Sequence, residues 1–142
     1  MSYLLDTCVV SELSRPRPDP GVVAWIAEAD VASLHLSAIT IGEVRRGALR
    51  LPAGKRRTSL SDWSERLRSS FSGRVLAIDE SVALRWAETA ARAERSGRPG
   101  SFADGLIAAT ALERGLTLVT RNFKDILRTG VDALDPFTPT AD

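Results

Sequence analysis

Short apolar runs alternate with longer segments of helical character along this chain, and this alternation restricts the fold more than any other feature of the sequence. The apolar runs have the length of β-strands and cover residues 3–5, 32–36, 74–78 and 116–120. Each is followed by a stretch whose apolar residues recur three and four positions apart, as in an amphipathic helix. Such alternation is typical of parallel sheets, because parallel neighbours require helical crossovers. We therefore expect an α/β fold with a parallel twisted sheet of four to five strands flanked by helices.

Capping residues mark where several of these helices begin and end. Asp19 followed by Pro20 predicts a helix start, since aspartate caps helices and proline fits the first helical turn. Asp79 is predicted to cap a long helix that follows it. Gly115 is predicted to end the helix that precedes it.

The length and composition of the chain fit one domain. With 142 residues, 44% of them apolar, the chain can bury a sizeable core and has little room for a second domain. We expect this domain to span residues 1–142, with 136–142 as a loose C-terminal tail. The longest run without Asp, Glu, Lys or Arg is Val31–Gly42, which is too short and too polar for a membrane span. The N-terminus has no signal-peptide pattern, so a cytoplasmic location is expected.

Cys8 is the only cysteine, so the sequence predicts neither an internal disulfide nor a cysteine metal cluster. A nucleophilic Cys8 served by the only histidine, His35, is an alternative, but neither residue lies in a recognisable catalytic signature. We expect Cys8 to be a small buried residue. His35 is expected to be a surface or supporting residue, on the strand face opposite Leu34 and Leu36.

Asp6 and Asp104 are the carboxylates with the most informative surroundings. Asp6 directly follows the first expected strand, and α/β folds bind their ligands at the carboxyl ends of parallel strands. Asp104 lies in an apolar segment, Ser101–Leu112, that is typical of a buried helix and has no Lys or Arg three or four residues from Asp104. Burial of a lone carboxylate costs roughly several kcal/mol, so a neutralising partner such as a cation is predicted.

Glu43, Asn122 and Asp125 complete a set of oxygen ligands. Glu43 lies near the start of an expected helix, where an exposed ion pair with Arg46 is an alternative role. Asn122 and Asp125 follow the last expected strand, whose carboxyl end should lie beside that of the first strand. Carboxylate and amide oxygens select hard ions, so Mg²⁺ or Mn²⁺ is the expected metal, and such a site suits phosphodiester hydrolysis.

Four blocks of sequence follow one another along the chain: Tyr3–Thr7, Ser37–Glu43, Phe102–Ala111 and Gly115–Asn122. In this order they resemble the PIN-domain ribonucleases, specifically the VapC and FitB-like toxins of bacterial toxin–antitoxin pairs. The resemblance implies an endoribonuclease that depends on Mg²⁺ or Mn²⁺ and hydrolyses RNA. It also implies inhibition by a cognate antitoxin, a homodimer, and a toxin–antitoxin hetero-oligomer.

The resemblance also assigns roles to individual residues. Asp6 and Asp104 correspond to the family's main metal ligands, and Glu43 corresponds to the acidic residue that holds the metal directly or through water. Asp125 is favoured as the fourth acid, although Ile126 replaces the aromatic residue that follows it in many relatives. Thr7, Thr120 and Asn122 are the supporting residues, and Asn122 is also the alternative to Asp125 as the fourth ligand.

Basic residues are concentrated in one segment of the chain. Residues 37–74 contain nine basic and three acidic residues, a charge of +6, so that the remainder carries −5 of the net +1. Such an excess can steer a polyanion, whereas a solvated helical face in a chain with 17 Arg and 2 Lys is the alternative. The side chains expected to contact the RNA backbone or acidic groups of the antitoxin are Arg45, Arg46, Lys55, Arg56 and Arg57.

Two other functions remain as alternatives. One is a catalytically weak or inactive PIN module that binds RNA or a protein partner, which the unusual fourth acid would explain. The other is aspartyl-phosphate phosphotransfer, since a strand-end Asp followed by Thr also opens such sites. The sequence argues against phosphotransfer, because Asp6-Thr7-Cys8 lacks a second Asp two positions on, and neither Lys55 nor Lys124 follows a strand as a phosphate-binding lysine would.

Overall fold

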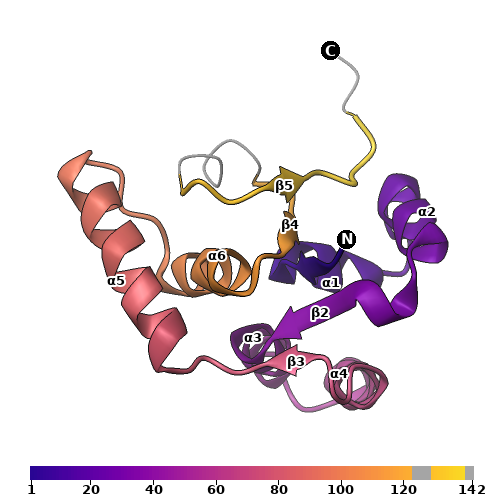
Figure 1. Cartoon of the computed structure of the whole chain (residues 1–142). Coiled ribbons are helices and arrows are strands. Elements are labelled where there is room, and N and C mark those ends of the chain that lie inside the picture. The colour runs from indigo at the N-terminus through magenta and orange to yellow at the C-terminus, as the bar shows by residue number, and fades with distance from the viewer. Residues whose placement is uncertain (123–128, 140–142) are drawn as a thin grey trace.

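The computed structural model describes residues 1–122 and 129–139, which contain one five-stranded parallel sheet (Figure 1). The strands are β1 (Tyr3–Leu5), β2 (Leu34–Ser37), β3 (Val75–Leu76), β4 (Thr117–Val119) and β5 (Ala133–Leu134). They lie in the order β3-β2-β1-β4-β5, and each neighbouring pair is parallel. The expected α/β fold with four to five parallel strands is therefore confirmed.

The described residues also contain six α-helices that connect and cover the strands. They are α1 (Thr7–Leu13), α2 (Pro20–Glu28), α3 (Ala38–Leu49), α4 (Lys55–Ser70), α5 (Glu80–Arg95) and α6 (Phe102–Arg114). The predicted caps are confirmed, since Asp19 accepts from the N–H of Gly21 and Asp79 from that of Val82. Gly115 ends α6 in the left-handed conformation, with φ at 66°. No helix among these described segments is long and apolar enough to span a membrane.

Three strands are shorter than the sequence predicted, and one of them, β4, covers three residues instead of residues 116–120. Asp30 caps a short 3-10 turn, η1 (Val31–Ser33), so β2 begins at Leu34 instead of Ala32. β3 covers two residues instead of residues 74–78, because Asp79 already caps α5 and the chain turns into that helix. β5, which no periodic pattern marks, pairs with β4 through Leu118 and Ala133.

The sheet has an apolar core on each face, because successive strand residues point to opposite sides. Leu5 and Val119 pack in one cluster with residues of α1 and α2. Leu4 and Leu118 pack in the other cluster with Ile107 of α6. The two clusters hold β1 and β4 side by side at the centre of the sheet, so that the segments following these strands lie at one edge.

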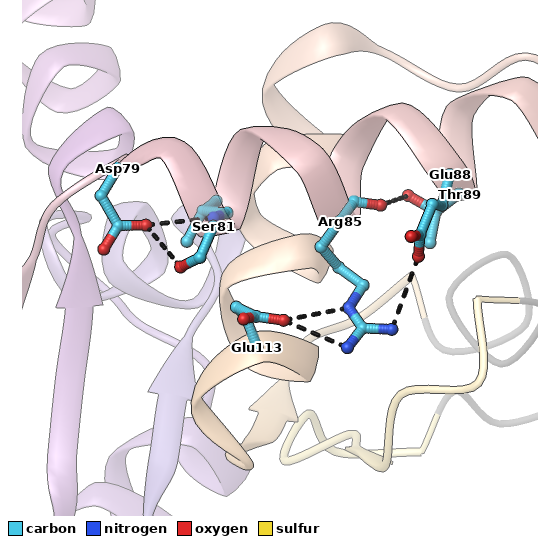
Figure 2. A network of polar contacts seen from close by, with 7 residues as sticks. Asp79, Ser81, Arg85, Glu88, Thr89 and Glu113 are labelled. Atoms are coloured by element: carbon cyan, nitrogen blue, oxygen red, sulfur yellow. Dashed lines mark hydrogen bonds and ion pairs between the residues drawn. The ribbon is translucent and has the colours of Figure 1, made fainter.

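Helices α5 and α6 pack against each other, and polar bonds join the first half of α5 to the end of α6 (Figure 2). The Arg85 guanidinium donates from Nε to Glu113 Oε1 at 3.2 Å, and its Nη2 lies 3.1 Å from the same oxygen. Arg114 and Asp79 form a second ion pair at 2.9 Å. The C-terminal half of α5 therefore lies beside the first turn of α6, which carries Asp104.

The segment after β5 packs against the body of the protein, so the prediction of a loose tail from Pro136 is wrong for its first residues. Phe137 is 8% exposed and belongs to the same apolar cluster as the residues of α2. Thr138 donates from its backbone N–H and from its hydroxyl to Asp19 Oδ1, at 2.9 and 3.0 Å. Only a glycine fits at Gly21, because a Cβ there would lie 2.6 Å from the Pro136 carbonyl oxygen. The last predicted tail residues, 140–142, lie outside the described residues.

Candidate active site

Asp6 occupies the junction between β1 and α1, at the carboxyl edge of the sheet. Its backbone N–H donates to the Val119 carbonyl of the neighbouring strand at 2.9 Å. Its side chain caps α1, with Oδ1 accepting from the Thr7 N–H at 2.8 Å. The residue is 3% exposed, so its carboxylate is almost removed from water.

Thr120 supports the other oxygen of Asp6 from the end of β4. Its hydroxyl donates to Asp6 Oδ2 at 2.6 Å and accepts from the Asn122 N–H at 3.1 Å. The strand ends of β1 and β4 therefore meet as the sequence predicted, and Thr120 is fully buried between them.

The pKa of Asp6 is raised above its usual value, chiefly because burial penalises the charged form. The negative charge of Asp104 raises this pKa further, while hydrogen bonds from Thr120, Thr7 and Cys8 lower it in part. Among the described residues, neither Asp6 nor Asp104 forms an ion pair with a basic side chain. A cation would relieve both the burial penalty and the repulsion between the two carboxylates.

Glu43 reaches the same edge of the sheet from the second turn of α3. Its Oε1 accepts a 2.7 Å hydrogen bond from the Thr7 hydroxyl, which lies 3.0 Å from the hydroxyl of Thr40. The alternative ion pair with Arg46 is wrong, since the ion pairs of the described residues do not include Glu43. Thr40, which is fully buried, was missed from the sequence. Its spacing of three residues from Glu43, which places both on one helix face, was the available signal.

Asp104 is exposed, so the prediction of a buried lone carboxylate is wrong for this residue. The burial of α6 begins at Leu106, after the first turn. Asp104 lies in that first turn, where Ser101 caps the helix by accepting from the Asp104 N–H at 3.1 Å. The positive end of the helix dipole stabilises a carboxylate at this position.

The fourth predicted acid, Asp125, lies outside the described residues, as does Ile126. Asn122, the competing candidate, is exposed and lines the same groove as Asp104. Within residues 1–122 and 129–139, no three Asp, Glu, His or Cys side chains are close enough together to hold a metal ion. The oxygen donors at this edge fit a hard divalent cation in chemical type, with Asp6 and Asp104 electrostatically coupled and Glu43 joined to the Asp6 loop through Thr7.

Cys8 and His35 do not form a catalytic pair. Cys8 Sγ lies 3.7 Å from both Asp6 Oδ2 and Thr120 Oγ1. Burial and the nearby Asp6 charge raise the pKa of Cys8 to about 11, so the thiol stays protonated at neutral pH. His35 Nδ1 instead lies within hydrogen-bond distance of the Tyr3 and Ser33 carbonyls.

The basic residues of α3 and α4 form a mixed surface. Arg45 pairs closely with Glu65 of α4, which also pairs with Arg68 at 3.5 Å. Arg74 donates to the backbone carbonyls of Val31 and Leu34 and therefore has a structural role. Of the other predicted contact residues, Arg46, Lys55 and Arg56 are exposed and Arg57 is half-buried.

Comparison with known families identifies the family to which this fold belongs. A family model described as the PIN domain matches residues 3–130, which is most of the chain. The chain belongs to the PIN-domain family. This PIN domain is 40% identical over 137 residues to "VapC ribonuclease Y4jK" of Sinorhizobium fredii, a match that covers 96% of the chain and 98% of the relative. The family predicted from the four sequence blocks is therefore confirmed.

Two further comparisons concern the FitB toxins. The PIN domain is 40% identical over 138 residues to "Toxin FitB" of Neisseria gonorrhoeae, covering 94% of the chain and 97% of the relative. A solved structure of FitAB bound to an IR36 DNA fragment superposes with a TM-score of 0.89 at 36% identity, covering 98% of each chain. The similarity therefore extends over the whole PIN domain, including the first and fourth strands, which Asp6 and Thr120 directly follow.

Proposed function

We propose that this PIN domain is a metal-dependent endoribonuclease toxin that hydrolyses RNA phosphodiester bonds and is neutralised by a cognate antitoxin. The observation that carries the proposal is the buried Asp6 carboxylate, which has no basic partner among the described residues and is coupled to the charge of Asp104. A carboxylate is kept in such surroundings at a cost to stability, which a bound cation offsets. The 40% identity to a VapC ribonuclease over nearly the whole chain supports the reaction class.

Asp6, Glu43, Asp104 and Asp125 are the proposed ligands of the metal, which we take to be Mg²⁺ or Mn²⁺. All-oxygen donors favour these hard ions over zinc or copper. When bound, the metal polarises the phosphoryl oxygens and lowers the pKa of a coordinated water. The catalytic role of the acidic side chains is to hold the metal, so no protein nucleophile is required.

The threonines position these acids. The Thr7 N–H and the Thr120 hydroxyl each bind one oxygen of Asp6, which fixes the plane of the carboxylate. Oδ2 also accepts from the Cys8 thiol at 3.7 Å, whereas Oδ1 keeps a further lone pair, so Asp6 retains its capacity for a cation. The Thr7 hydroxyl orients Glu43 in the same way, and Asn122 extends this edge towards Asp104. Loss of such supporting bonds typically weakens a metal site by about 10- to 100-fold.

The antitoxin is the proposed protein partner, as the similarity to "Toxin FitB" and to a FitAB complex supports. Arg46, Lys55 and Arg56 are exposed basic side chains that would contact RNA phosphates or acidic groups of the antitoxin. Arg45 already pairs with Glu65, so its contribution would require exchange of that ion pair. We propose a homodimer within the toxin–antitoxin hetero-oligomer, acting in the cytoplasm.

Cleavage of total RNA with and without metal tests this proposal. We expect EDTA to abolish cleavage, Mg²⁺ or Mn²⁺ to restore it, and Asp6→Asn and Asp104→Asn to reduce it to background. Asp62→Asn is the matched control, because this carboxylate is exposed on α4, away from β1 and α6. Intact RNA under every metal condition, from a folded protein, would contradict the enzyme proposal.

A non-catalytic PIN module is the second candidate, favoured by one observation. No group of three possible ligands in residues 1–122 and 129–139 is compact enough to hold a metal. RNA or antitoxin binding without cleavage would support this module. Release of phosphate from small esters without RNA cleavage would instead support aspartyl-phosphate chemistry at Asp6.

A further inference from the structure

A groove runs from the candidate active site along the contact between two helices. It lies between α5 from Trp86 onward, residues 96–101 and the first turns of α6, and we call it the α5–α6 groove. Its volume is about 910 Å³, within the range of roughly 300–1,000 Å³ that is typical of small-ligand sites. Asp104 and Asn122 line one end of the groove, so a chain bound in it would continue into the candidate active site.

Two aromatic rings form an apolar wall of this groove. Trp86 of α5 and Phe102 of α6 pack edge to face, with ring centroids 5.1 Å apart and an angle of 72° between the rings. The Trp86 indole rests against Gly105, where an added Cβ would lie 3.1 Å from the ring. Phe102 is nevertheless 63% exposed, although it is only two residues from Asp104. Phe102 therefore packs on Trp86 but remains largely exposed to solvent, and it lines the same groove as the proposed metal ligand Asp104.

The charged side chains of the groove cancel one another. Arg92 and Arg98 line it together with Glu94 and Asp104, which gives two positive and two negative groups. The groove therefore attracts polyanions weakly, and the basic surface of α3 and α4 is better suited to capture RNA by its phosphates. What the groove offers instead is a ring face with arginine donors nearby, the combination by which proteins recognise unpaired bases.

We propose that the α5–α6 groove binds an unpaired base of a single-stranded RNA next to the phosphodiester that is cleaved, with Phe102 as its stacking surface. This inference rests on the proposed ribonuclease function, because the RNA strand must continue from the groove to Asp104. Arg92 and Arg98 contact the nucleotide on either side of the stacked base. Phe102 is then a residue that determines which RNA sites are cleaved.

Binding of RNA measured in EDTA tests the groove separately from catalysis. The probe is a fluorescein-labelled single-stranded RNA of mixed sequence, followed by anisotropy with the full chain. We expect Phe102→Ala to weaken binding about tenfold, the effect of losing one stacked base, and Phe102→Tyr to retain affinity because it keeps the ring. Leu84→Ala is the matched control, since Leu84 is 61% exposed on α5 but does not line the groove.

Duplex RNA of the same sequence provides the second comparison, because its bases are not free to stack on the protein. We expect Phe102→Ala to leave duplex binding unchanged and to redistribute the cleavage sites on single-stranded RNA in Mg²⁺. Unchanged affinity together with unchanged cleavage sites would overturn the inference while leaving the ribonuclease intact. Phe102-dependent RNA binding by a protein that never cleaves would support the groove and contradict the proposed function.

The same variants distinguish RNA from two other possible occupants of the groove, the antitoxin and a second copy of the chain. If Phe102→Ala weakens the complex with the antitoxin but leaves RNA binding unchanged, the groove is a protein site and the inference is wrong. If sedimentation shows that Phe102→Ala converts dimers into monomers of unchanged RNA affinity, the groove is a contact between copies of the chain, and the inference is again wrong.

Discussion

At the scale of single residues, Asp6 lowers the stability of the fold but is required for the proposed activity. Its carboxylate is buried, and its pKa is raised by burial and by the charge of Asp104. A carboxyl whose pKa is higher in the folded protein than in the unfolded chain costs stability as the pH rises above the unfolded-state pKa, and the full cost is reached above the folded-state pKa. Asp6 therefore represents a cost at neutral pH that is retained for its proposed function.

Asp6→Asn should therefore unfold at a higher urea concentration than the natural protein at pH 7 in EDTA. The amide oxygen can accept from the Thr7 N–H, while the amide nitrogen donates to the Thr120 hydroxyl. The gain should shrink as the pH falls, because Asp6 becomes neutral in the natural protein, and should vanish below the usual carboxyl pKa of 3.8. A variant that is less stable at pH 7 would contradict this account of the Asp6 environment.

The sequence predicted the strand-end acid better than it predicted the helical acid. The place of Asp6 follows from local order alone, since it is the first residue after an apolar run that must lie in the sheet. The exposure of Asp104 depends on how the rest of the fold covers α6. In the folded protein, the buried residues of α6 begin only at Leu106. The spacing of Thr40 and Glu43 places both on one helix face, but their contacts with Thr7 join residues 33 and 36 positions apart, which local spacing does not reveal.

At the scale of elements, α5 is held to α6 at its N-terminus by Asp79. This residue caps α5 through the Val82 N–H, accepts from the Ser81 hydroxyl, and pairs with Arg114 of α6. These contacts lower the pKa of Asp79, the hydrogen bond from Val82 being the largest cause. The negative charge of Asp79 therefore contributes stability above the unfolded-state pKa, which is lost as the pH falls through the lower folded-state value.

Asp79→Asn isolates this charge, because asparagine is an equally good helix cap. We expect the variant to melt at a lower temperature than the natural protein at pH 7, with the difference closing as the pH falls below 3.8, the usual pKa of the carboxyl. Asp62→Asn, an exposed α4 variant, is the control and should melt like the natural protein at both pH values. A difference for Asp79→Asn that persists in acid would mean that geometry, not charge, is responsible.

Helix ends were predictable from sequence, whereas the edge strand β5 was not. Asp19, Asp79 and Gly115 act on atoms within three or four residues, so their chemistry is readable locally. β5 consists of two residues and exists because β4 supplies the pairing partners. No periodicity can develop over two residues, and a strand of this length can be recognised only within the folded sheet.

At the scale of the whole molecule, the C-terminal segment closes the structure by docking on the start of α2. Phe137 fills the core, Thr138 shares the Asp19 cap with Gly21, and Arg121 lies 4.0 Å above the Phe137 ring. Residues more than a hundred positions apart therefore share one small contact region. This contact was unpredictable, because the polar sequence after Pro136 has the composition of a loose end.

Gly21→Ala should destabilise the protein by about 2 kcal/mol, because the added methyl group meets backbone that cannot move without opening this contact. Gly47→Ala is the matched control, since a Cβ there meets nothing within 4 Å in the interior of α3. The Gly47→Ala variant should be more stable than the natural protein by about 0.5–1 kcal/mol, because alanine favours the helix over glycine. Both values are measured by urea unfolding, and equal effects of the two substitutions would contradict the proposed close approach.

The edges of the sheet determine how this protein can meet other chains. β3 and β5, the two outer strands, are each two residues long, and Pro136 follows β5 closely with no N–H to donate. An incoming peptide would find little free backbone with which to extend the sheet, so recognition by strand addition is disfavoured. A partner must bind through side chains presented by the helices, and the same short edges protect the folded chain from joining others into fibrils.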